Sequence, residues 1–219
     1  MHPRVEKAAS KEPNYFNKRP GQRKSEEWYR RQLGGAENRL HGDATVGYFE
    51  SLKVPPAVRA FNPDVRLVVL LRDPVRRAWS SFWERPKPAR YKGGVPGGVR
   101  MLWDDLLQPA KVWGAEHVNI PWGHVRRGVY IFGLNNWLCH FPREQLLVLR
   151  SEDMFADPNA VYQRVLAHIG LEPFELPVYQ KYASKSRGRL PEDLVAALQN
   201  FYRPYNAELK AKFGIGGDY

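Results

Sequence analysis

The sequence has little cysteine and no long apolar run. Its 219 residues contain one cysteine, Cys139, so no disulfide can form within the chain, and its folding does not depend on an oxidising compartment. No apolar stretch approaches the ~20 residues that a membrane-spanning helix needs. The first residues, MHPRVEKAASKEPNYF, lack the apolar core of a signal peptide. The six histidines show no metal-ligand spacing, so we expect no metal.

Basic residues are in excess over acidic ones. The formal net charge is +11 and the pI is about 9.8. This balance favours an anionic partner, which could be a nucleic acid, an acidic polysaccharide, a membrane surface or a nucleotide. The length is that of one domain with a sizeable core, so we expect residues 1–219 to form a single domain.

The most informative stretch is LVVLLRDPVRRAWSSF, residues 67–82. Its first five residues are apolar and β-branched or leucine, which predicts a strand buried on both faces. Asp73 is a favourable helix N-cap and Pro74 suits the first helical position. Apolar residues then recur on one helix face at Val75, Ala78, Trp79 and Phe82. The pattern predicts a strand that passes into a helix through a very tight turn.

A turn of this kind favours an anion. In open α/β sheets ligands lie at the carboxyl end of the strands, and a helix N-terminus offers free N–H groups and a partial positive charge. Arg72 lies at the turn and Ser80 lies two turns into the helix, so a guanidinium and a hydroxyl are available for a phosphate. The alternative is that Arg72 and Asp73 form an ordinary cap and ion pair.

Strands and helices alternate along the remaining chain. Helices are predicted at residues 25–33, 55–61, 101–107, from 130 to 141, from 151 to about 169, and at 191–213. A second buried strand is predicted at residues 145–149, and short extended segments at 11–16 and 43–49. The alternation predicts an α/β fold with a parallel sheet flanked by helices on both faces.

Residues 85–98 are rich in proline, glycine and basic residues, which predicts a loop. Its GGVPGG resembles a phosphate-cradling loop only in composition. No apolar strand precedes it and no Gly-Lys-Ser/Thr follows, so a P-loop kinase-like function is disfavoured.

Several segments resemble those of one enzyme family. RDPVRRAWSSF resembles the segment with which sulfotransferases bind the 3′-phosphate of the donor 3′-phosphoadenosine 5′-phosphosulfate, and the matching residues are Arg72 and Ser80. Five further segments resemble those of the Golgi carbohydrate sulfotransferases of the heparan and chondroitin type, in the same order along the chain: KEPNYF (11–16), DATVGYF (43–49), LLVLRSEDMFADP (146–158), SRGR (186–189) and FYRPYNAEL (201–209).

The resemblance implies a function and a set of site residues. The donor-binding residues are expected to be Arg72, Ser80, Ser186, Arg187, Gly188 and Arg189. Glu12 is expected to act as the general base that takes the proton of the acceptor hydroxyl, although it can also be read as a surface Glu paired with Lys11 or Arg19. The acceptor is expected to be a glycan, most simply an anionic polysaccharide, with no nucleic acid partner. The family places the enzyme in the Golgi lumen.

The sequence departs from the family at two points. Ala44 stands where many heparan-type enzymes have a lysine, which leaves the acceptor open. The family also begins with a strand and a Pro-Lys-x-Gly-Thr-Thr loop that binds the 5′-phosphosulfate, whereas this sequence starts at Met1, past that loop. We therefore expect a P-loop-type sheet without its first strand, in a chain that is truncated relative to the family, inactive alone and poorly stable.

A second hypothesis is a non-catalytic module that binds polyanions or glycans through basic segments such as NKRPGQRK and RPKPARYKGG. Steep salt dependence of binding would favour that module, and donor-dependent labelling of a glycan would favour the enzyme.

Overall fold

The structure, a computed structural model, describes residues 2–18, 20–36, 38–84, 92–107, 123–179 and 188–216. Its strands are β1 (Leu67–Leu71) and β2 (Leu146–Arg150). Its helices are α1 (Glu26–Leu33), α2 (Val54–Phe61), α3 (Pro74–Glu84), α4 (Gly94–Leu107), α5 (Tyr130–Leu138), α6 (Ser151–Ala156), α7 (Pro158–His168) and α8 (Glu192–Phe213). Short 3₁₀ helices are η1 (Pro20–Gln22), η2 (Val46–Tyr48), η5 (Arg126–Gly128) and η6 (Arg143–Gln145).

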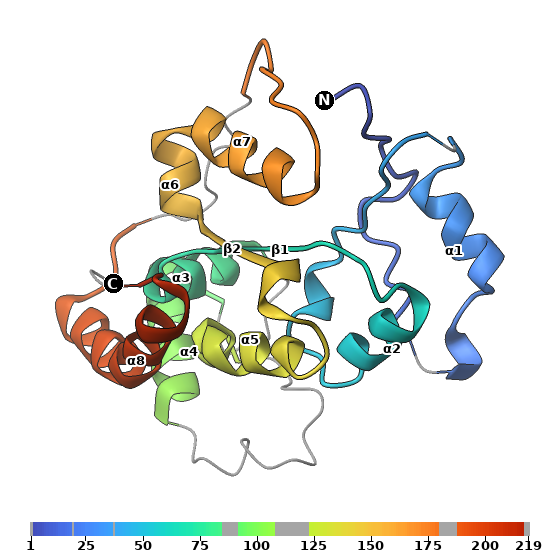
Figure 1. Cartoon of the computed structure of the whole chain (residues 1–219). Helices are drawn as coiled ribbons and strands as arrows, with labels where there is room; N and C mark the ends of the chain where they lie inside the picture. The colour runs from blue at the N-terminus through green and yellow to red at the C-terminus, as the bar shows by residue number, and fades with distance from the viewer. Residues whose placement is uncertain are drawn as a thin grey trace.

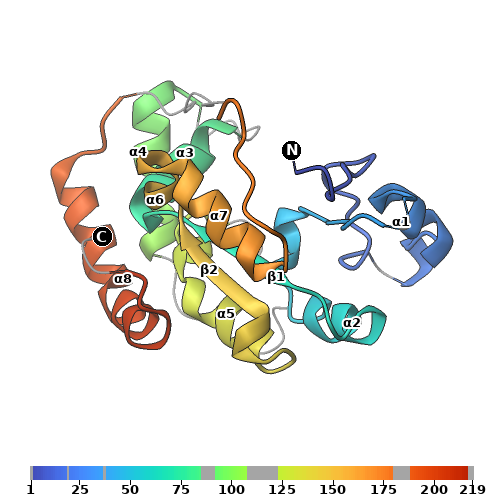
Figure 2. The same ribbon diagram turned by 45° about the horizontal axis from the view of Figure 1, so that its top comes forward.

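The two strands are parallel and lie between layers of helices. They pair in register from Leu67 opposite Leu146 to Leu71 opposite Arg150. Helices α6 and α7 lie on one side of the strands, and α3, α5 and α8 lie on the other (Figure 1). The N-terminal segment, α1 and α2 lie beyond the end at which β1 begins (Figure 2). The carboxyl ends of β1 and β2 therefore lie next to the starts of α3 and α6, respectively.

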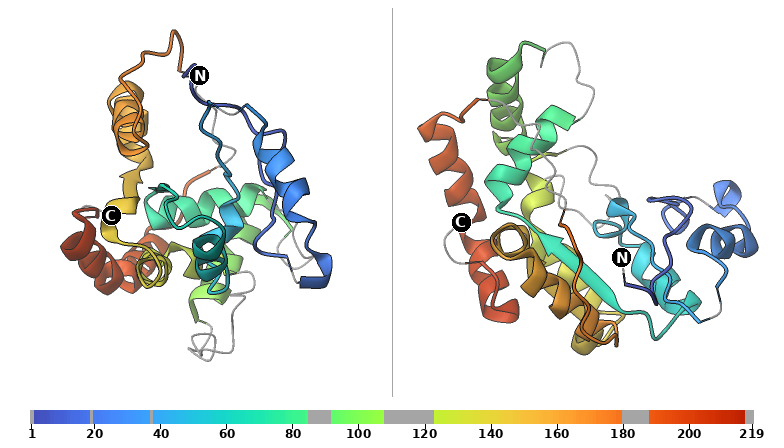
Figure 3. Two further views of the ribbon diagram at one scale, coloured as in Figure 1. Left: turned by 45° about the vertical axis from the view of Figure 1, so that its right-hand side comes forward. Right: turned by 90° about the horizontal axis from the view of Figure 1, so that it is seen from above.

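The core consists of three apolar clusters. One joins α3, α4 and α8 around Trp79, Phe82 and Tyr202. A second, rich in aromatic rings, joins the N-terminal segment to α1, α2 and the end of α5. The third fills the space between the strands, α5 and α8 around Leu134 and Leu146. The right-hand view of Figure 3 shows α1 and α2 set apart from α8, with the strands between them.

The predicted strand–turn–helix unit is confirmed. β1 ends at Leu71, α3 begins at Pro74, and the Asp73 carboxylate accepts a hydrogen bond from the Arg76 backbone N–H at 2.6 Å. An aspartate at the N-cap satisfies one of the N–H groups that the first helical turn leaves without a partner. The predicted helices at residues 25–33, 55–61 and 191–213 are confirmed as α1, α2 and α8.

The prediction that β1 is buried on both faces is wrong. The side chains of Val68 and Leu70 are 41% and 44% exposed, whereas Leu71 is buried. β1 pairs with β2 along one edge only in the described residues. An apolar run fixes the tendency to form a strand, but which faces are covered depends on elements that lie far away in the sequence.

The predicted loop at residues 85–98 is wrong over its second half, since α4 begins at Gly94; residues 85–91 lie outside the described residues. Gly98 explains the difference. A Cβ atom at Gly98 would lie 2.5 Å from Trp79 Cζ3 and 2.9 Å from the Phe82 ring. The missing side chain lets α4 pack directly on α3, and this burial offsets the poor helix propensity of glycine.

The two segments predicted as extended contain no strand. Residues 11–16 follow an irregular path, with Asn14 in the left-handed region at φ 56°. Residues 46–48 form η2 rather than an extended piece, so that part of the prediction is wrong. Side-chain hydrogen bonds rather than a backbone ladder hold both segments, as described below.

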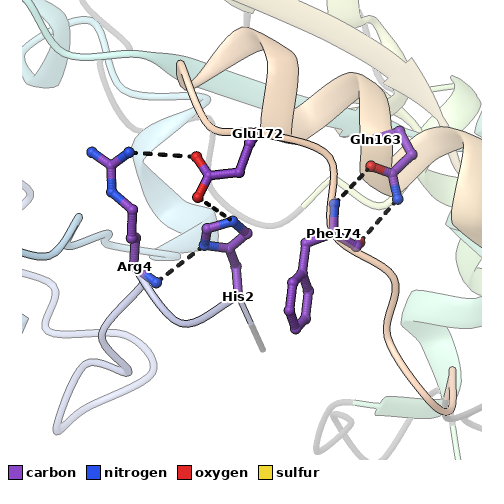
Figure 4. Close-up of polar contacts among 5 residues, drawn as sticks. All are labelled: His2, Arg4, Gln163, Glu172 and Phe174. Carbon is purple, nitrogen blue, oxygen red and sulfur yellow. Dashed lines mark hydrogen bonds and ion pairs between the residues drawn. The ribbon is translucent and has the colours of Figure 1, made fainter.

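The N-terminus is fastened to the segment that follows α7 (Figure 4). The buried His2 accepts a hydrogen bond from the Arg4 N–H through Nδ1, so Nε2 carries the proton and lies 3.7 Å from Glu172 Oε1. Arg4 Nη1 donates to Glu172 Oε2 at 3.4 Å. Next to them, Gln163 exchanges two hydrogen bonds with the Phe174 backbone.

Candidate functional site

The turn between β1 and α3 is fixed by three side chains. The Ser151 hydroxyl donates to the Leu71 carbonyl oxygen at 2.8 Å, and the Tyr130 hydroxyl donates to the Arg72 carbonyl oxygen at 2.8 Å. The Glu152 carboxylate accepts from the Asp73 N–H at 2.9 Å. Each residue of the turn is thus held by a side chain from the start of α5 or α6. These bonds fix where the turn presents Arg72.

The Arg72 guanidinium is the available charge at this turn. The side chain is half-buried and makes no hydrogen bond or ion pair with another described residue. It stands next to the N-terminus of α3, whose N–H groups favour an anion. The buried Ser80 hydroxyl, further along α3, also lacks a hydrogen bond within the described part of the chain. Both groups can therefore bind an oxyanion.

The acidic groups at the turn are engaged by its backbone. Burial raises the pKa of the Asp73 carboxyl, and the nearby Glu152 acts in the same direction, while the hydrogen bond from the Arg76 N–H opposes them. Each carboxylate already accepts an N–H from the turn or from α3. They therefore serve to order the turn, and Arg72 remains the group that can meet a ligand.

The segment that contains Gly188 and Arg189 lies against α3 and α4. The Trp79 indole N–H donates to the Gly188 carbonyl oxygen at 3.4 Å, which places Gly188 beside the residue that precedes Ser80. Gly188 adopts φ 72°, and a Cβ atom there would lie 2.6 Å from Val95 Cγ2. Both the backbone conformation and the close approach require glycine. Arg189 is exposed; the other two predicted donor residues, Ser186 and Arg187, lie outside the described residues.

Glu12 lies on the surface in the irregular segment at residues 11–16. Its carboxylate has no hydrogen-bond or ion-pair partner among the described residues, so the alternative pairing with Lys11 is not formed. Its carbonyl oxygen accepts from Asn14 Nδ2 at 2.8 Å. The segment is anchored directly after Glu12, where Tyr15 and Phe16 are buried in the aromatic cluster.

Asp43 organises this anchoring. Its Oδ1 accepts from the Thr45 N–H and the Thr45 hydroxyl at 2.8 and 2.7 Å. Its Oδ2 accepts from the hydroxyls of Tyr48 and Tyr29 at 2.8 and 3.0 Å. One carboxylate with four donors joins η2 to α1. Burial raises the pKa of Tyr48 to about 12 and also raises that of Tyr29, so both hydroxyls keep their protons and donate.

The partners of Asp43 in turn hold the backbone that follows Glu12. Thr45 Oγ1 accepts from the Asn14 N–H at 3.2 Å, and Tyr48 Oη accepts from the N–H groups of Tyr15 and Phe16 at 2.8 and 3.3 Å. Two segments that are about thirty residues apart in the chain thereby form one unit. The position of Glu12 therefore depends on Asp43.

The predicted site residues fall into two groups. Arg72 precedes α3, Ser80 lies within it and Gly188 contacts it through Trp79, whereas Glu12 belongs to the N-terminal segment, and no hydrogen bond or ion pair joins it to these residues within the described part of the chain. The sequence did not single out Asp43, Ser151 or Glu152 as positioning residues. A polar residue directly at the end of a buried strand, as in Ser151-Glu152, is the signal that could have found two of them.

No group of three potential metal-binding side chains occurs among the residues that the structure describes. None of the helices described there has the length and apolar character needed to cross a membrane.

Comparison with protein families gives one clear match. Residues 4–189 match the family of the sulfotransferase domain. Heparan sulfate glucosamine 3-O-sulfotransferase 6 of Homo sapiens is 28% identical over 231 residues, which cover 94% of this chain and 64% of that protein. Heparan sulfate glucosamine 3-O-sulfotransferase 3B1 of Homo sapiens is 27% identical, with 94% of this chain and 56% of that protein covered. The chain therefore spans between 56% and 64% of the length of these relatives.

A solved structure supports the fold. The crystal structure of a sulfotransferase from Alicyclobacillus acidocaldarius aligns with a TM-score of 0.69 at 22% identity, and the alignment covers 96% of this chain and 85% of that one. The parallel strands and flanking helices thus confirm the α/β class predicted from the sequence.

Proposed function

The chain belongs to the sulfotransferase domain family, and on that basis we propose that it transfers a sulfuryl group from 3′-phosphoadenosine 5′-phosphosulfate to a carbohydrate. The group transferred would go to a hydroxyl or an amine of the acceptor. The relatives named above act on heparan sulfate glucosamine, which supports a glycosaminoglycan acceptor for this chain. Their likeness also supports a Golgi location.

The observation that carries the proposal is the half-buried Arg72 guanidinium without a partner among the described residues, at a turn locked by three side chains. A fixed cation beside a helix N-terminus suits a phosphate, and the 3′-phosphate of the donor is the group that we assign to it. Ser80 would add a neutral donor from α3. Gly188 and Arg189 would close over the same phosphate together with Ser186 and Arg187.

In sulfuryl transfer the acceptor hydroxyl attacks the sulfur atom of the donor, in line with the bond to the leaving phosphate. The hydroxyl must lose its proton as it does so. A carboxylate within hydrogen-bond reach can take that proton. We assign this role to Glu12, whose exposed carboxylate has no partner among the described residues and whose backbone is held through Asp43. Positioning and charge neutralisation would supply most of the rate. The excess of basic residues would draw in an anionic acceptor.

The test combines transfer with donor binding. Purified protein, alone and joined at its N-terminus to the family's first strand and Pro-Lys-x-Gly-Thr-Thr loop, is incubated with donor labelled in its sulfate and with heparan sulfate or chondroitin, and label on the glycan is measured. In the joined form Glu12→Gln should lower turnover by about 10²- to 10⁴-fold, the usual cost of removing a general base. Its affinity for 3′-phosphoadenosine 5′-phosphate, measured by calorimetry, should not change. Glu27→Gln, which removes an exposed carboxylate of α1, is the matched control.

Two results would contradict the proposal. An active Glu12→Gln variant would place the base elsewhere. Absence of transfer in both forms, together with glycan binding of steep salt dependence, would identify the non-catalytic module instead.

A further inference from the structure

The segment that carries Glu12 is held on both sides of that residue. On the C-terminal side, Thr45 and Tyr48 bind the backbone that follows Glu12. On the N-terminal side, the contacts begin at His2, whose side chain is only 2% exposed, whereas Arg4 close by in the sequence is exposed. A buried polar ring in an otherwise exposed segment marks the point at which that segment is anchored.

The anchor joins His2 to Glu172, in the segment that follows α7 (Figure 4). The His2 ring accepts the Arg4 N–H through Nδ1 at 3.1 Å and lies edge-on to the Phe174 ring, with centroids 5.1 Å apart. Its buried Nε2–H makes no hydrogen bond with a described residue and lies 3.7 Å from Glu172 Oε1. The other oxygen of Glu172 accepts from Arg4 Nη1 at 3.4 Å. His2, Arg4 and Glu172 are called the clasp below.

The Glu172 side of the clasp is itself fixed to α7. The Gln163 amide of α7 donates to the Phe174 carbonyl oxygen at 2.9 Å and accepts from the Phe174 N–H at 3.2 Å. The hydrogen bond from its own backbone N–H lowers the pKa of the Glu172 carboxyl, and the nearby Arg4 acts in the same direction, so the carboxylate is charged. The clasp therefore joins the segment that carries Glu12 to a charged acceptor on a fixed backbone.

A series of backbone hydrogen bonds continues from the clasp toward Glu12. The Leu40 N–H donates to the Arg4 carbonyl oxygen at 2.7 Å, and the Leu40 carbonyl oxygen accepts from the Glu6 N–H at 2.9 Å. The Ala9 N–H then donates at 2.8 Å to a carbonyl oxygen in the last turn of α1. The backbone is thus held from the clasp to a point only a few residues before Glu12.

We propose that His2 and Glu172 are positioning residues for sulfuryl transfer and that they act through Glu12. The proposal rests on the proposed function, in which Glu12 takes the proton of the acceptor. The clasp fixes the segment before Glu12, as the partners of Asp43 fix it after Glu12. A general base must lie within hydrogen-bond reach of the proton that it removes, and a misplacement of about 1 Å can lower the rate about 10²-fold. The clasp raises the rate by fixing Glu12 and not by binding a substrate.

The test removes the acceptor of the clasp. Glu172→Ala leaves the His2 Nε2–H without the carboxylate that it faces, and in the joined form of the protein it should lower kcat about tenfold. The KM for the donor should change by no more than about twofold, because the variant leaves the donor-binding residues intact. Glu175→Ala removes an exposed carboxylate of the same segment and is the matched control. A wild-type kcat in Glu172→Ala, or an equal loss in Glu175→Ala, would overturn the proposal.

A double-mutant cycle shows whether Glu172 acts through Glu12. In the background of Glu12→Gln, Glu172→Ala should lower kcat no further, because the group that the clasp positions is already lost. A purely structural role would lower kcat by the same factor in both backgrounds. That result would mean that Glu172 supports the fold in general, and the positioning role would be refuted.

Hydrogen exchange follows the clasp in residues 1–219 without any transfer. Glu172→Ala should accelerate exchange of the Glu6 and Ala9 N–H groups severalfold, because the backbone bonds of these residues depend on the clasp. The N–H groups of Tyr15 and Phe16, which Tyr48 holds, should change by no more than about twofold. An unchanged rate at Ala9 would show that the anchoring does not extend toward Glu12, which would contradict the proposal.

The transfer assay separates this proposal from the proposed function. Transfer that is slowed by Glu12→Gln and not by Glu172→Ala would refute the role of the clasp and leave the enzyme standing. Absence of transfer in both forms of the protein would refute the enzyme, and the catalytic role of the clasp would fall with it.

Discussion

The Tyr130 hydroxyl donates a hydrogen bond to the Arg72 carbonyl oxygen at 2.8 Å, across 58 residues of sequence. Tyr130 is buried at the first turn of α5, so this bond ties the helix to the turn at the end of β1. Tyr130 belongs to the buried cluster between the strands, α5 and α8. Its bond acts on the backbone of Arg72 and leaves the guanidinium unconstrained.

Tyr130→Phe should therefore weaken both the fold and the anion site. Removal of one partner of a buried hydrogen bond costs about 1–3 kcal/mol, which urea unfolding would measure. The affinity for 3′-phosphoadenosine 5′-phosphate should also fall, because Arg72 is less well placed. In the background of Arg72→Ala, Tyr130→Phe should no longer change that affinity. An equal effect in both backgrounds would show that Tyr130 does not act through Arg72.

Arg72→Ala should lower the affinity for the donor product far more than it lowers the stability of the fold. We expect it to weaken binding of 3′-phosphoadenosine 5′-phosphate by about 1.5–3 kcal/mol, the value of a hydrogen bond to a charged group. Its free energy of unfolding should change little, since the guanidinium has no partner in the described residues. Arg76→Ala, an exposed arginine in the first turn of α3, is the control. Unchanged calorimetric affinity in Arg72→Ala would remove Arg72 from the site.

The sequence could predict structure where neighbours in the chain decide it. The unit formed by β1, Asp73 and α3 depends on an apolar run, an N-cap and a proline, all within a few residues. It could not predict the helix that contains Gly98, since that glycine is favoured by the rings of Trp79 and Phe82 on another helix. Local propensity carries no information about such partners.

The same limit applies to the site. Residue types and spacing pointed to Arg72, Ser80 and the residues near Gly188, and the hydrogen bond from Trp79 to Gly188 brings that segment to α3. Asp43 was missed because its role consists of contacts to Tyr29, Thr45 and Tyr48, which only the folded chain brings together. Nothing in the residues around Asp43 indicates that its carboxylate accepts four hydrogen bonds.

Asp43→Asn should release the segment that carries Glu12. An amide oxygen can replace only one of the two carboxylate oxygens, so two of the four donors lose their acceptor. We expect a loss of about 2–6 kcal/mol in the free energy of unfolding, since each of the two orphaned donors costs ~1–3 kcal/mol.

Hydrogen exchange should locate the effect of Asp43→Asn. In the variant, the backbone N–H groups of Asn14, Tyr15 and Phe16 should exchange faster than in the wild type, because Thr45 and Tyr48 no longer hold them. The exchange rates of β1 and β2 should increase less. Asp64→Asn, at an exposed turn, is the control. Uniform acceleration over the whole chain would mean that Asp43 supports the fold in general and not this segment.

The pH dependence of stability should report the burial of Asp73. Burial raises the pKa of this carboxyl above its ordinary value of 3.8. The protonated form is thus relatively favoured in the folded state, and its contribution to stability is present below pH 3.8 and is lost as the pH rises through the folded pKa. Relative to Asp73→Asn, which keeps an N-cap side chain, the wild type should gain stability on acidification from about pH 7 to about pH 4. A difference between the two proteins that stays constant in urea unfolding over this range would show that the carboxyl is not perturbed.

The exposed face of β1 should make the chain associate with itself. Val68 and Leu70 are 41% and 44% exposed on one face, and β1 has a strand partner on one edge only within the described residues. An apolar strand with a free edge readily pairs with another chain. Val68→Thr/Leu70→Thr keeps residues that tolerate a strand and removes apolar surface, so sedimentation should show fewer oligomers at equal concentration. The free energy of unfolding should change by no more than about 1 kcal/mol, since these side chains have little burial to lose.

Val69→Thr is the control for this prediction. Val69 packs against the cluster between the strands, α5 and α8, and its replacement should destabilise the fold without reducing association. A double variant that destabilises the fold as Val69→Thr does, or that associates as the wild type does, would show that this face is covered within the molecule itself.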